Sequence, residues 1–404
     1  RYQEVTGVQT CALPIYFGQP ANTQQMIEKD ILDLRHLLHA NPDISNQEYG
    51  TAGLIKNFLA PYHPTEIIEG IGGAGLAAVY RFSKKGPTVA IRCELDALPI
   101  QETNSFNHKS TKKGISHKCG HDGHMAIIAS LAPWLERKPL ACGTVVLLFQ
   151  PAEETGEGAK RVMEDEKFKK IRPDYVFALH NIPKEPMHSI ILMDNGFSAE
   201  VQSVIIKVRG KESHASEPEN GINPALGLSE IIQKISELNV PEPSDSSFAL
   251  LTPIHINMGQ KSYGVSPANG ELHYTLRTWS TAKMDGVKSK LIKLVEKISH
   301  EHKLRYELEW LEHFPASSVD SESNAFVRQA AEANNFSIIQ RKTPFKFGED
   351  FGWFSNSYKT VMFGIGSGVS TPALHNADYD FPDELLSTGV SMFKSIILDI
   401  LIER

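Results

Sequence analysis

The chain has 404 residues, more than one ordinary hydrophobic core supports, so we expect two domains. Hydrophobic residues make up 41% and charged residues 22%, which excludes a disordered or fibrous chain. The net charge is −7, no basic stripe stands out, and the apolar run 125–135 is too short to span a bilayer. Neither nucleic acid nor a membrane is therefore an expected partner.

The N-terminal residues and the cysteines bear on where the protein works. Residues 5–15 read VTGVQTCALPI, which a common sequencing adapter encodes in one frame, so we interpret 1–16 as non-native. The four cysteines, at positions 11, 93, 119 and 142, form no disulfide framework, which fits a reducing compartment. We expect the cytoplasm, with a secreted or periplasmic location as the alternative because a natural leader would be missing from such a chain.

The first predicted elements form an α/β pattern. Apolar residues at three- and four-residue spacings predict helices over 24–40 and 49–59. Short apolar runs then predict buried strands, and a helix is expected between the second and third of them. These strands are 75–80, 88–93, 144–149 and 175–179, the last ending at His180, and the helix is 123–135. Buried strands that alternate with helices indicate an α/β sandwich.

After residue 197 the order becomes β-α-β-β-α-β, the split unit of a ferredoxin-like domain. Its predicted elements are 201–208, 223–238, 248–257, 271–278, 282–300 and 304–310. A helix at 323–334, a strand at 360–364 and a closing helix at 382–402 then return to the first pattern. We therefore predict a three-layer αβα domain made of 17–197 and 312–404, with 198–311 inserted as an α+β domain.

The strongest local signal is SHKCGHDGH at 116–124. Cys119 and three histidines, His117, His121 and His124, lie within eight residues of one another, and the glycines let the backbone bend sharply. Thiolate and imidazole are the ligands that borderline divalent ions prefer. The alternative, a polar loop with incidental histidines, accounts less well for four candidate ligands in so short a span.

Two adjacent carboxylates, Glu153 and Glu154, follow the strand predicted at 144–149. Adjacent residues tend to point in different directions, so the two can take different roles. One can bind a metal ion while the other serves as general base toward a water. The alternative is a solvated acidic turn, which the buried strand directly before the pair disfavours.

Five other residues are weaker candidates when taken alone. His180, at a strand end, and His375, after a glycine-rich loop, fit metal ligands or ordinary structural histidines. His214 has no candidate ligand near it in sequence, so it fits a donor to an oxyanion or a plain surface residue. Glu94 and Asp96 end a predicted strand and fit either the orientation of ligand histidines or a salt bridge.

Taken together, these motifs resemble the M20 metallopeptidase family, in particular its amidohydrolase branch. That branch includes hippurate hydrolases, N-acyl-amino-acid amidohydrolases and auxin-conjugate hydrolases. The resemblance covers the chain from about residue 24 onward and rests on seven ordered motifs. They are LRHLLHANPDISNQE at 34–48, RCELDALPI, CGHDGH, QPAEE, LH at 179–180, HAS at 214–216 and LH at 374–375.

The resemblance implies a site and an activity. It implies two divalent cations (Mn, Zn, Ni or Co) with the Cys119 thiolate between them, and five metal ligands: Cys119, His121, Glu154, His180 and His375. Catalysis would fall to Glu153 as general base, with Asp96 in support, and to His214, which in similar proteins reaches across a homodimer. Arg277 stands where the family has a substrate-binding arginine of a lid and dimerisation domain, the role implied for 198–311.

The expected function is thus a metal-dependent amidohydrolase that cleaves the amide bond of N-acyl amino acids with a metal-activated water. The alternatives are an aminopeptidase or dipeptidase of the same family, or a non-catalytic binding module on this fold. The intact ligand set and base argue against the last. Two departures predict a different substrate preference: Glu94 where the branch often has Asp, and Gly-Val-Ser-Pro at 264–267 where the family often has Asn-Val-Ile-Pro.

Overall fold

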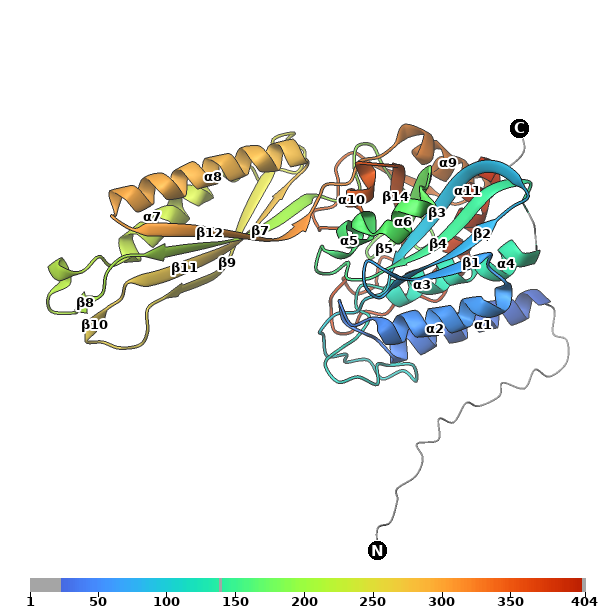
Figure 1. The fold of residues 1–404 in the computed structure, drawn as a ribbon, viewed down its shortest axis with the longest axis horizontal. Helices are drawn as coiled ribbons and strands as arrows, with labels where there is room; N and C mark the ends of the chain where they lie inside the picture. The colour runs from blue at the N-terminus through green and yellow to red at the C-terminus, as the bar shows by residue number, and fades with distance from the viewer. Residues whose placement is uncertain (1–22, 138–139, 402–404) are drawn as a thin grey trace, which may run out of the picture.

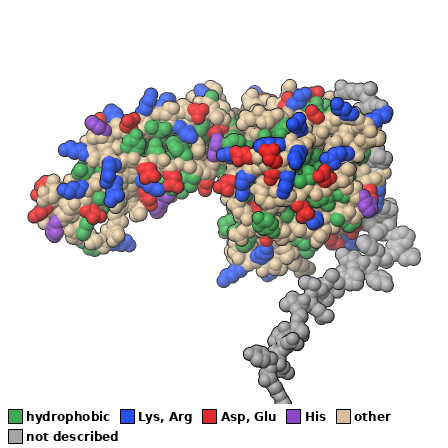
Figure 2. All heavy atoms as spheres, in the orientation of Figure 1, with side chains coloured by type: hydrophobic (Ala, Val, Ile, Leu, Met, Phe, Trp, Pro, Cys, Tyr) green, Lys and Arg blue, Asp and Glu red, His purple; other side chains and the backbone are tan. Residues whose placement is uncertain are grey.

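The computed structural model describes residues 23–137 and 140–401, which form two lobes (Figure 1). The adapter-like segment 1–16 lies outside the described residues. The larger lobe contains an eight-stranded sheet, and the second lobe contains a four-stranded sheet. A narrow waist joins the lobes, and the face shown in Figure 2 is indented below it.

The sheet of the larger lobe has the strand order β1-β2-β4-β3-β5-β14-β6-β13. Its central strands β4, β3, β5 and β14 run parallel, while β1 and β2 pair antiparallel at one edge. The strands are β1 (Glu66–Ile71), β2 (Gly75–Arg81), β3 (Lys84–Glu94), β4 (Cys142–Gln150), β5 (Tyr175–Ile182), β6 (Ile190–Met193), β13 (Ile338–Arg341) and β14 (Lys359–Gly366).

Helices cover both faces of this sheet, because side chains alternate between two cores. Along β4, Val145 and Leu147 pack into one core, whereas Val146 and Leu148 pack into the other. The first core holds α1 (Thr23–Ala40), α2 (Tyr49–Leu59), α3 (His121–Ala129), α4 (Leu131–Arg137), α9 (Ser321–Ala333) and α11 (Leu385–Leu401). The second holds α5 (Gly158–Glu164), α6 (Glu166–Ile171) and α10 (Gly352–Ser355). The mixed α/β architecture with a largely parallel central sheet is confirmed.

Three predictions about the elements near the candidate site are wrong. The helix predicted at 123–135 is two helices, α3 and α4, because Pro133 has no N–H to continue the hydrogen-bond ladder of α3. Helix α3 also begins earlier than predicted, at His121. Strand β5 runs past residue 179 to Ile182, since pairing with β14 continues through His180.

The second lobe has the strand order β12-β7-β11-β9, with all neighbours antiparallel. Its elements are β7 (Glu200–Arg209), α7 (Ala225–Ser236), β9 (Ala249–Met258), β11 (Asn269–Thr278), α8 (Thr281–Glu301) and β12 (Arg305–Phe314). Both helices pack on one face of the sheet, which leaves the other face, here named the open face, without a helix. A small ribbon of β8 (Ser213–His214) and β10 (Val265–Ser266) lies at the outer end (Figure 1). Among the described helices of both lobes, none is long and apolar enough to cross a membrane.

Candidate metal centre and active site

The candidate ligands meet at the carboxyl ends of the central parallel strands. β3 ends at Glu94, β4 ends just before Glu153 and Glu154, and His180 lies near the end of β5. Parallel strands bring their carboxyl ends to one edge of the sheet, where α/β proteins bind ligands. The motif predicted at 116–124 runs into α3 beside the same edge, so His121 occupies the first helical position.

Two overlapping groups of ligand atoms share Cys119. Sγ of Cys119 lies 3.5 Å from Nε2 of His180, and both residues form one compact group with His121. Cys119 forms a second compact group with Glu154 and His375, in which Nε2 of His375 lies 3.7 Å from Oε2 of Glu154. In each group the ligand atoms all lie within 4.8 Å of one another. A thiolate shared by two such groups allows two neighbouring cations to be held side by side.

Two of the polar atoms that face this centre lack hydrogen-bond partners within the described chain. Nε2 of His121 and Oε1 of Glu154 are buried without a hydrogen bond and lie 3.9 Å apart. Buried polar atoms without a partner are rare in native proteins, so each needs an explanation. A divalent cation supplies one, because imidazole, carboxylate and thiolate are its usual protein ligands. The residues present therefore fit two cations.

Neighbouring groups aim the ligand histidines. Nδ1 of His121 donates to the backbone carbonyl of Asp96 over 2.8 Å and lies 3.5 Å from its carboxylate. Nδ1 of His180 donates to the carbonyl of Asn181 over 2.8 Å. Both contacts leave Nε2 free to face the centre. Asp96 also accepts hydrogen bonds from Ser45 and from the backbone of Glu154, so it contacts two of the candidate ligand residues, His121 and Glu154.

The other two histidines of the motif have different surroundings. Nδ1 of His124 lies 2.7 Å from Glu94 and Nε2 lies 2.5 Å from Asn181, so both ring nitrogens are already hydrogen-bonded. Burial lowers the pKa of His117 to about 3, and its ring lies near His39, with centroids 6.4 Å apart. Of the three histidines, only His121 has a free ring nitrogen at the centre.

Glu153 lies beside the ligand groups with its carboxylate shielded from solvent. Its Oε2 lies 3.9 Å from Nε2 of His121. Burial, followed by the charges of Glu349 and Glu154, raises the pKa of Glu153 well above its usual range. A carboxylate whose pKa is raised exchanges protons more readily near neutral pH than an exposed one, which suits a general base.

Three residues behind Glu153, namely Arg92, Glu349 and Asp350, were not predicted as part of the site. Arg92 is fully buried, with Nη2 2.7 Å from Asp350 and 3.1 Å from Glu349, and it also pairs with Glu94. This cation offsets part of the negative charge that these carboxylates place behind Glu153. Two of them could have been found from the sequence, because Glu349 and Asp350 are adjacent acidic residues inside the aromatic stretch 345–354. Glu153 and Glu154 are likewise an adjacent acidic pair.

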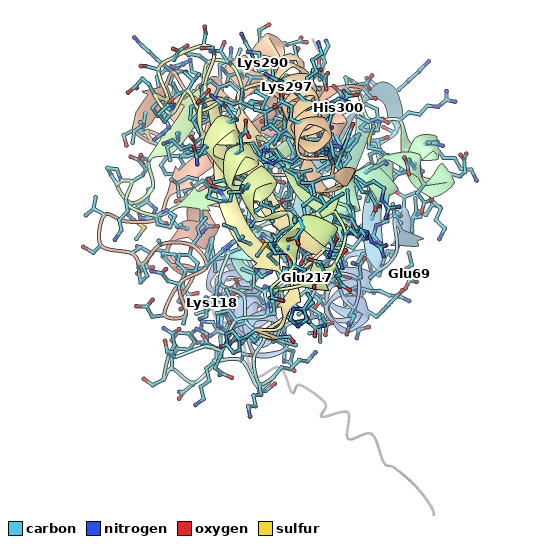
Figure 3. All side chains as sticks on the ribbon, turned by 90° about the vertical axis from the view of Figure 1, so that its left-hand side faces the viewer. Glu69, Lys118, Glu217, Lys290, Lys297 and His300 are labelled. Carbon is cyan, nitrogen blue, oxygen red and sulfur yellow. The ribbon has the colours of Figure 1, made fainter. Side chains whose placement is uncertain are left out.

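The structure does not bring His214 and Arg277 to the centre of their own chain. His214 is exposed on β8 at the outer end of the second lobe, where its Nδ1 lies 2.6 Å from Oγ of Ser216. In Figure 3 the outer end of the second lobe faces the viewer. Glu217, three positions after His214, is labelled on this lobe, and Lys118, next to Cys119, is labelled on the larger lobe behind it. Arg277 lies near the waist and donates to the carbonyl of Lys346 over 2.6 Å.

Comparison with known proteins identifies the family. The model described as peptidase family M20/M25/M40 matches residues 90–399, well over half of the chain. The chain belongs to this family. An N-acetyl-L-cysteine deacetylase of Bacillus subtilis is 32% identical over 342 residues, which are 83% of this chain and 80% of the relative.

Two further M20 relatives bear on the site. A hippurate hydrolase of Campylobacter jejuni is 29% identical, over 91% of this chain and 98% of its own. The crystal structure of a dinuclear metal-binding M20 peptidase from Bacillus subtilis has a TM-score of 0.80 at 25% identity, covering 93% of this chain and 99% of that one. This M20 protein is accordingly a metal-dependent hydrolase of amide bonds that uses two divalent cations.

Cation binding at this M20 centre should strengthen as the pH rises. Burial, then the charges of Glu154 and Glu153, raises the pKa of the Cys119 thiol well above its usual range. Burial opposes protonation of His121, but its hydrogen bond to Asp96 and the charge of Glu94 raise its pKa to about 10. Both groups are protonated in the metal-free protein at neutral pH, so an incoming cation must displace their protons.

We therefore expect Zn²⁺ affinity to rise about tenfold or more per pH unit between pH 6 and 8. Competition with a chromophoric chelator at several pH values measures this slope. Cys119→Ser should lower the number of protons released per bound Zn²⁺ by about one and so reduce the slope. The matched variant Cys142→Ser, outside the centre, should leave the slope unchanged. Affinity that did not change with pH would exclude the thiol as a ligand.

Proposed function

We propose that this enzyme removes the acyl group from N-acyl amino acids. The observation that carries the proposal is the pair of ligand groups that share Cys119, with Glu153 buried beside them. The names of the two curated relatives support it, because N-acetyl-L-cysteine and hippurate are both N-acylated amino acids. The five proposed ligands are Cys119, His121, Glu154, His180 and His375.

The proton transfers fall to Glu153. Two bound cations supply positive charge that polarises the amide carbonyl and acidifies a water. Glu153 takes the proton from the attacking water and returns it to the nitrogen of the departing amino acid, so the proton balance closes. Asp96 keeps His121 in the orientation that leaves Nε2 free. Arg277 is assigned to the carboxylate of the substrate, for which it must leave the carbonyl of Lys346 or come from a second chain.

The oxyanion that forms during attack needs a further donor, which we assign to His214. Within one chain this histidine lies at the outer end of the second lobe, on β8, while the centre lies in the larger lobe. A second copy of the chain related by a twofold axis can present its own His214 to the centre. The second lobe then serves as both lid and dimerisation domain.

The edge of the second lobe carries the features of such a dimer interface. β9 is the last strand of its sheet, so one row of its backbone groups has no neighbouring strand. Ile254 and Ile256 on this strand are 62% and 55% exposed, and Leu226 on the adjacent α7 is 73% exposed. Exposed apolar side chains beside an unpaired edge fit pairing with an identical edge, which we propose as the homodimer contact.

Ile256→Lys is expected to weaken this dimer, because it places a charge in the apolar part of the contact. We expect the dissociation constant to rise about tenfold or more, the equivalent of 1.4 kcal/mol. Analytical ultracentrifugation over a range of concentrations measures it. Leu37→Lys, on an exposed apolar residue of α1 in the larger lobe, is the matched control. Equal dissociation constants for both variants would exclude β9 from the interface.

A substrate panel tests the proposed activity against its closest alternative. We expect the purified protein, loaded with Zn²⁺ or Mn²⁺, to hydrolyse N-acetyl-cysteine and hippurate with higher kcat/KM than any free dipeptide. A clear preference for dipeptides would instead assign the aminopeptidase or dipeptidase alternative.

A thiolate ligand must stay reduced, and the described cysteines form no disulfide, so we infer a cytoplasmic location.

A further inference from the structure

A second cluster of metal-ligating side chains lies on the open face of the second lobe, apart from the catalytic centre. His255 on β9 and His273 on β11 are directly opposed in the strand register, with ring centroids 5.0 Å apart. Glu271 precedes His273 by two residues and therefore points to the same face. One carboxylate oxygen, Oε1 of Glu271, lies 3.9 Å from Nε2 of His255 and 3.8 Å from Nε2 of His273.

The backbone beside this cluster departs from regular pairing. The register of β9 against β11 shifts between His273 and Tyr274, directly beside the histidine pair, and regular pairing resumes with Pro253 opposite Tyr274. Pro253 lies in this part of β9, where it can be tolerated because β9 is an edge strand. Such bulges re-aim neighbouring side chains and are frequent near functional sites. The register shift thus lies next to both imidazoles of the cluster.

Two observations leave the ligand atoms available. Nε2 of His273 is shielded from solvent and has no hydrogen-bond partner in the described chain. The ammonium of Lys207, which lines the same hollow as Glu271, is held by Glu309 over 2.6 Å. The carboxylate of Glu271 makes no hydrogen bond within the described residues, and the side chain is about one-third exposed, so an ion from solvent can reach it.

We propose that His255, Glu271 and His273 bind a divalent transition-metal cation, with Zn²⁺ the best fit. Zinc bonds to imidazole nitrogen and carboxylate oxygen are about 2.0–2.2 Å long, which places tetrahedral ligand atoms roughly 3.3–3.6 Å apart. The two observed separations exceed that by a few tenths of an ångström, within the reach of small side-chain rotations. Two neutral imidazoles and one carboxylate favour zinc over magnesium or calcium, which prefer all-oxygen sites.

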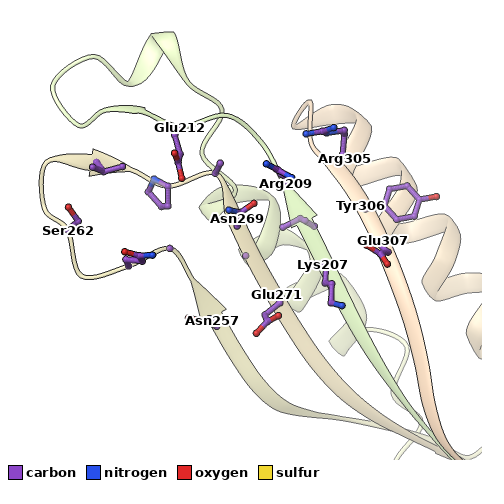
Figure 4. A pocket seen from close by; sticks show the side chains of 17 residues that line it. Lys207, Arg209, Glu212, Asn257, Ser262, Asn269, Glu271, Arg305, Tyr306 and Glu307 are labelled. Carbon is purple, nitrogen blue, oxygen red and sulfur yellow. The ribbon is translucent and has the colours of Figure 1, made fainter.

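Space for the remaining ligand is present beside the cluster. A hollow of about 660 Å³ covers the outer part of the open face and is lined by Glu271, Asn257 and Lys207, among others (Figure 4). Water or a small anion in this hollow can complete the coordination of the ion. The ion would join edge strand β9 to β11 on the face opposite the helices, and so stiffen the strand proposed to form the dimer contact.

Zn²⁺ uptake by the cation-loaded enzyme tests the site. In equilibrium dialysis against increasing Zn²⁺, we expect the wild-type protein to take up one more ion per chain than His255→Gln or His273→Gln. Loss of one direct ligand should weaken this ion at least tenfold, since loss of a supporting contact alone costs 10- to 100-fold. Glu271→Gln should weaken it similarly, and none of the three should change hydrolysis at low Zn²⁺.

His300→Gln is the matched control, because His300 is an exposed histidine of α8 outside the cluster (Figure 3). It should keep the additional ion. Equal Zn²⁺ uptake by the wild type and the cluster variants, or equal loss in His300→Gln, would overturn the proposal. The measured quantity is the difference in Zn²⁺ uptake between variants, so the test does not depend on which substrate the catalytic centre uses.

Discussion

Replacing Glu153 by glutamine is expected to lower kcat by roughly 10²–10⁴-fold, the range that a general acid–base group contributes. Glutamine keeps the size of the side chain but cannot take a proton from water. The variant should keep its full complement of cations, because the ligand role falls to Glu154, whose carboxylate lies 3.7 Å from His375 and 3.9 Å from His121. Steady-state kinetics together with elemental analysis measures both quantities.

Glu157→Gln provides the matched control, since Glu157 is an exposed acidic residue only four positions away. It should leave both kcat and cation content unchanged. Loss of cations from Glu153→Gln would mean that the roles of Glu153 and Glu154 are reversed. Full activity of Glu153→Gln would remove it from the proton transfers altogether.

Removing the imidazole of His214 should cost about 10²–10³-fold in kcat, as loss of one oxyanion donor typically does. Cation binding should not change, because His214 is exposed on β8 and belongs to neither ligand group. Ser216→Ala is a useful control: it removes the 2.6 Å contact to His214 but keeps the imidazole. A fully active His214→Ala protein would refute the role.

Mixing two inactive variants tests whether His214 acts across the proposed dimer. A dimer with one Glu153→Gln chain and one His214→Ala chain contains one centre with both groups and one centre with neither. After complete subunit exchange of equal amounts, roughly a quarter of the wild-type activity should return, because half of the dimers are mixed. If exchange occurs and no activity returns, the histidine acts within its own chain.

Much of the centre could be predicted because its residues are local in sequence or follow strands. Cys119 and His121 share one motif, and Glu154 and His180 lie at the ends of buried strands, where the parallel arrangement brings them together. The β-α-β-β-α-β order of the second lobe was likewise readable from periodicity. Strands β1, β6 and β13 were not predicted, since two of them have only four residues and β1 carries a mixed pattern.

What the sequence could not provide are relations that depend on tertiary packing. Nothing local separates His124, whose ring is bonded to Glu94 and Asn181, from His121, whose ring faces the centre. The pairing of Arg92 with Asp350 joins residues 258 positions apart. The cluster of His255 and His273 likewise exists only because the two strands align in register.

Removing and restoring the cations tests most directly whether hydrolysis depends on two cations bound at the centre that contains Cys119. In the His273→Gln variant, which lacks the proposed second-lobe site, removal of cations with a chelator should abolish hydrolysis of an N-acyl amino acid. Activity should return in step with Zn²⁺ or Mn²⁺ added up to two equivalents per chain and then level off. Hydrolysis that persists without cations, or that is fully restored without binding at Cys119, would contradict the account.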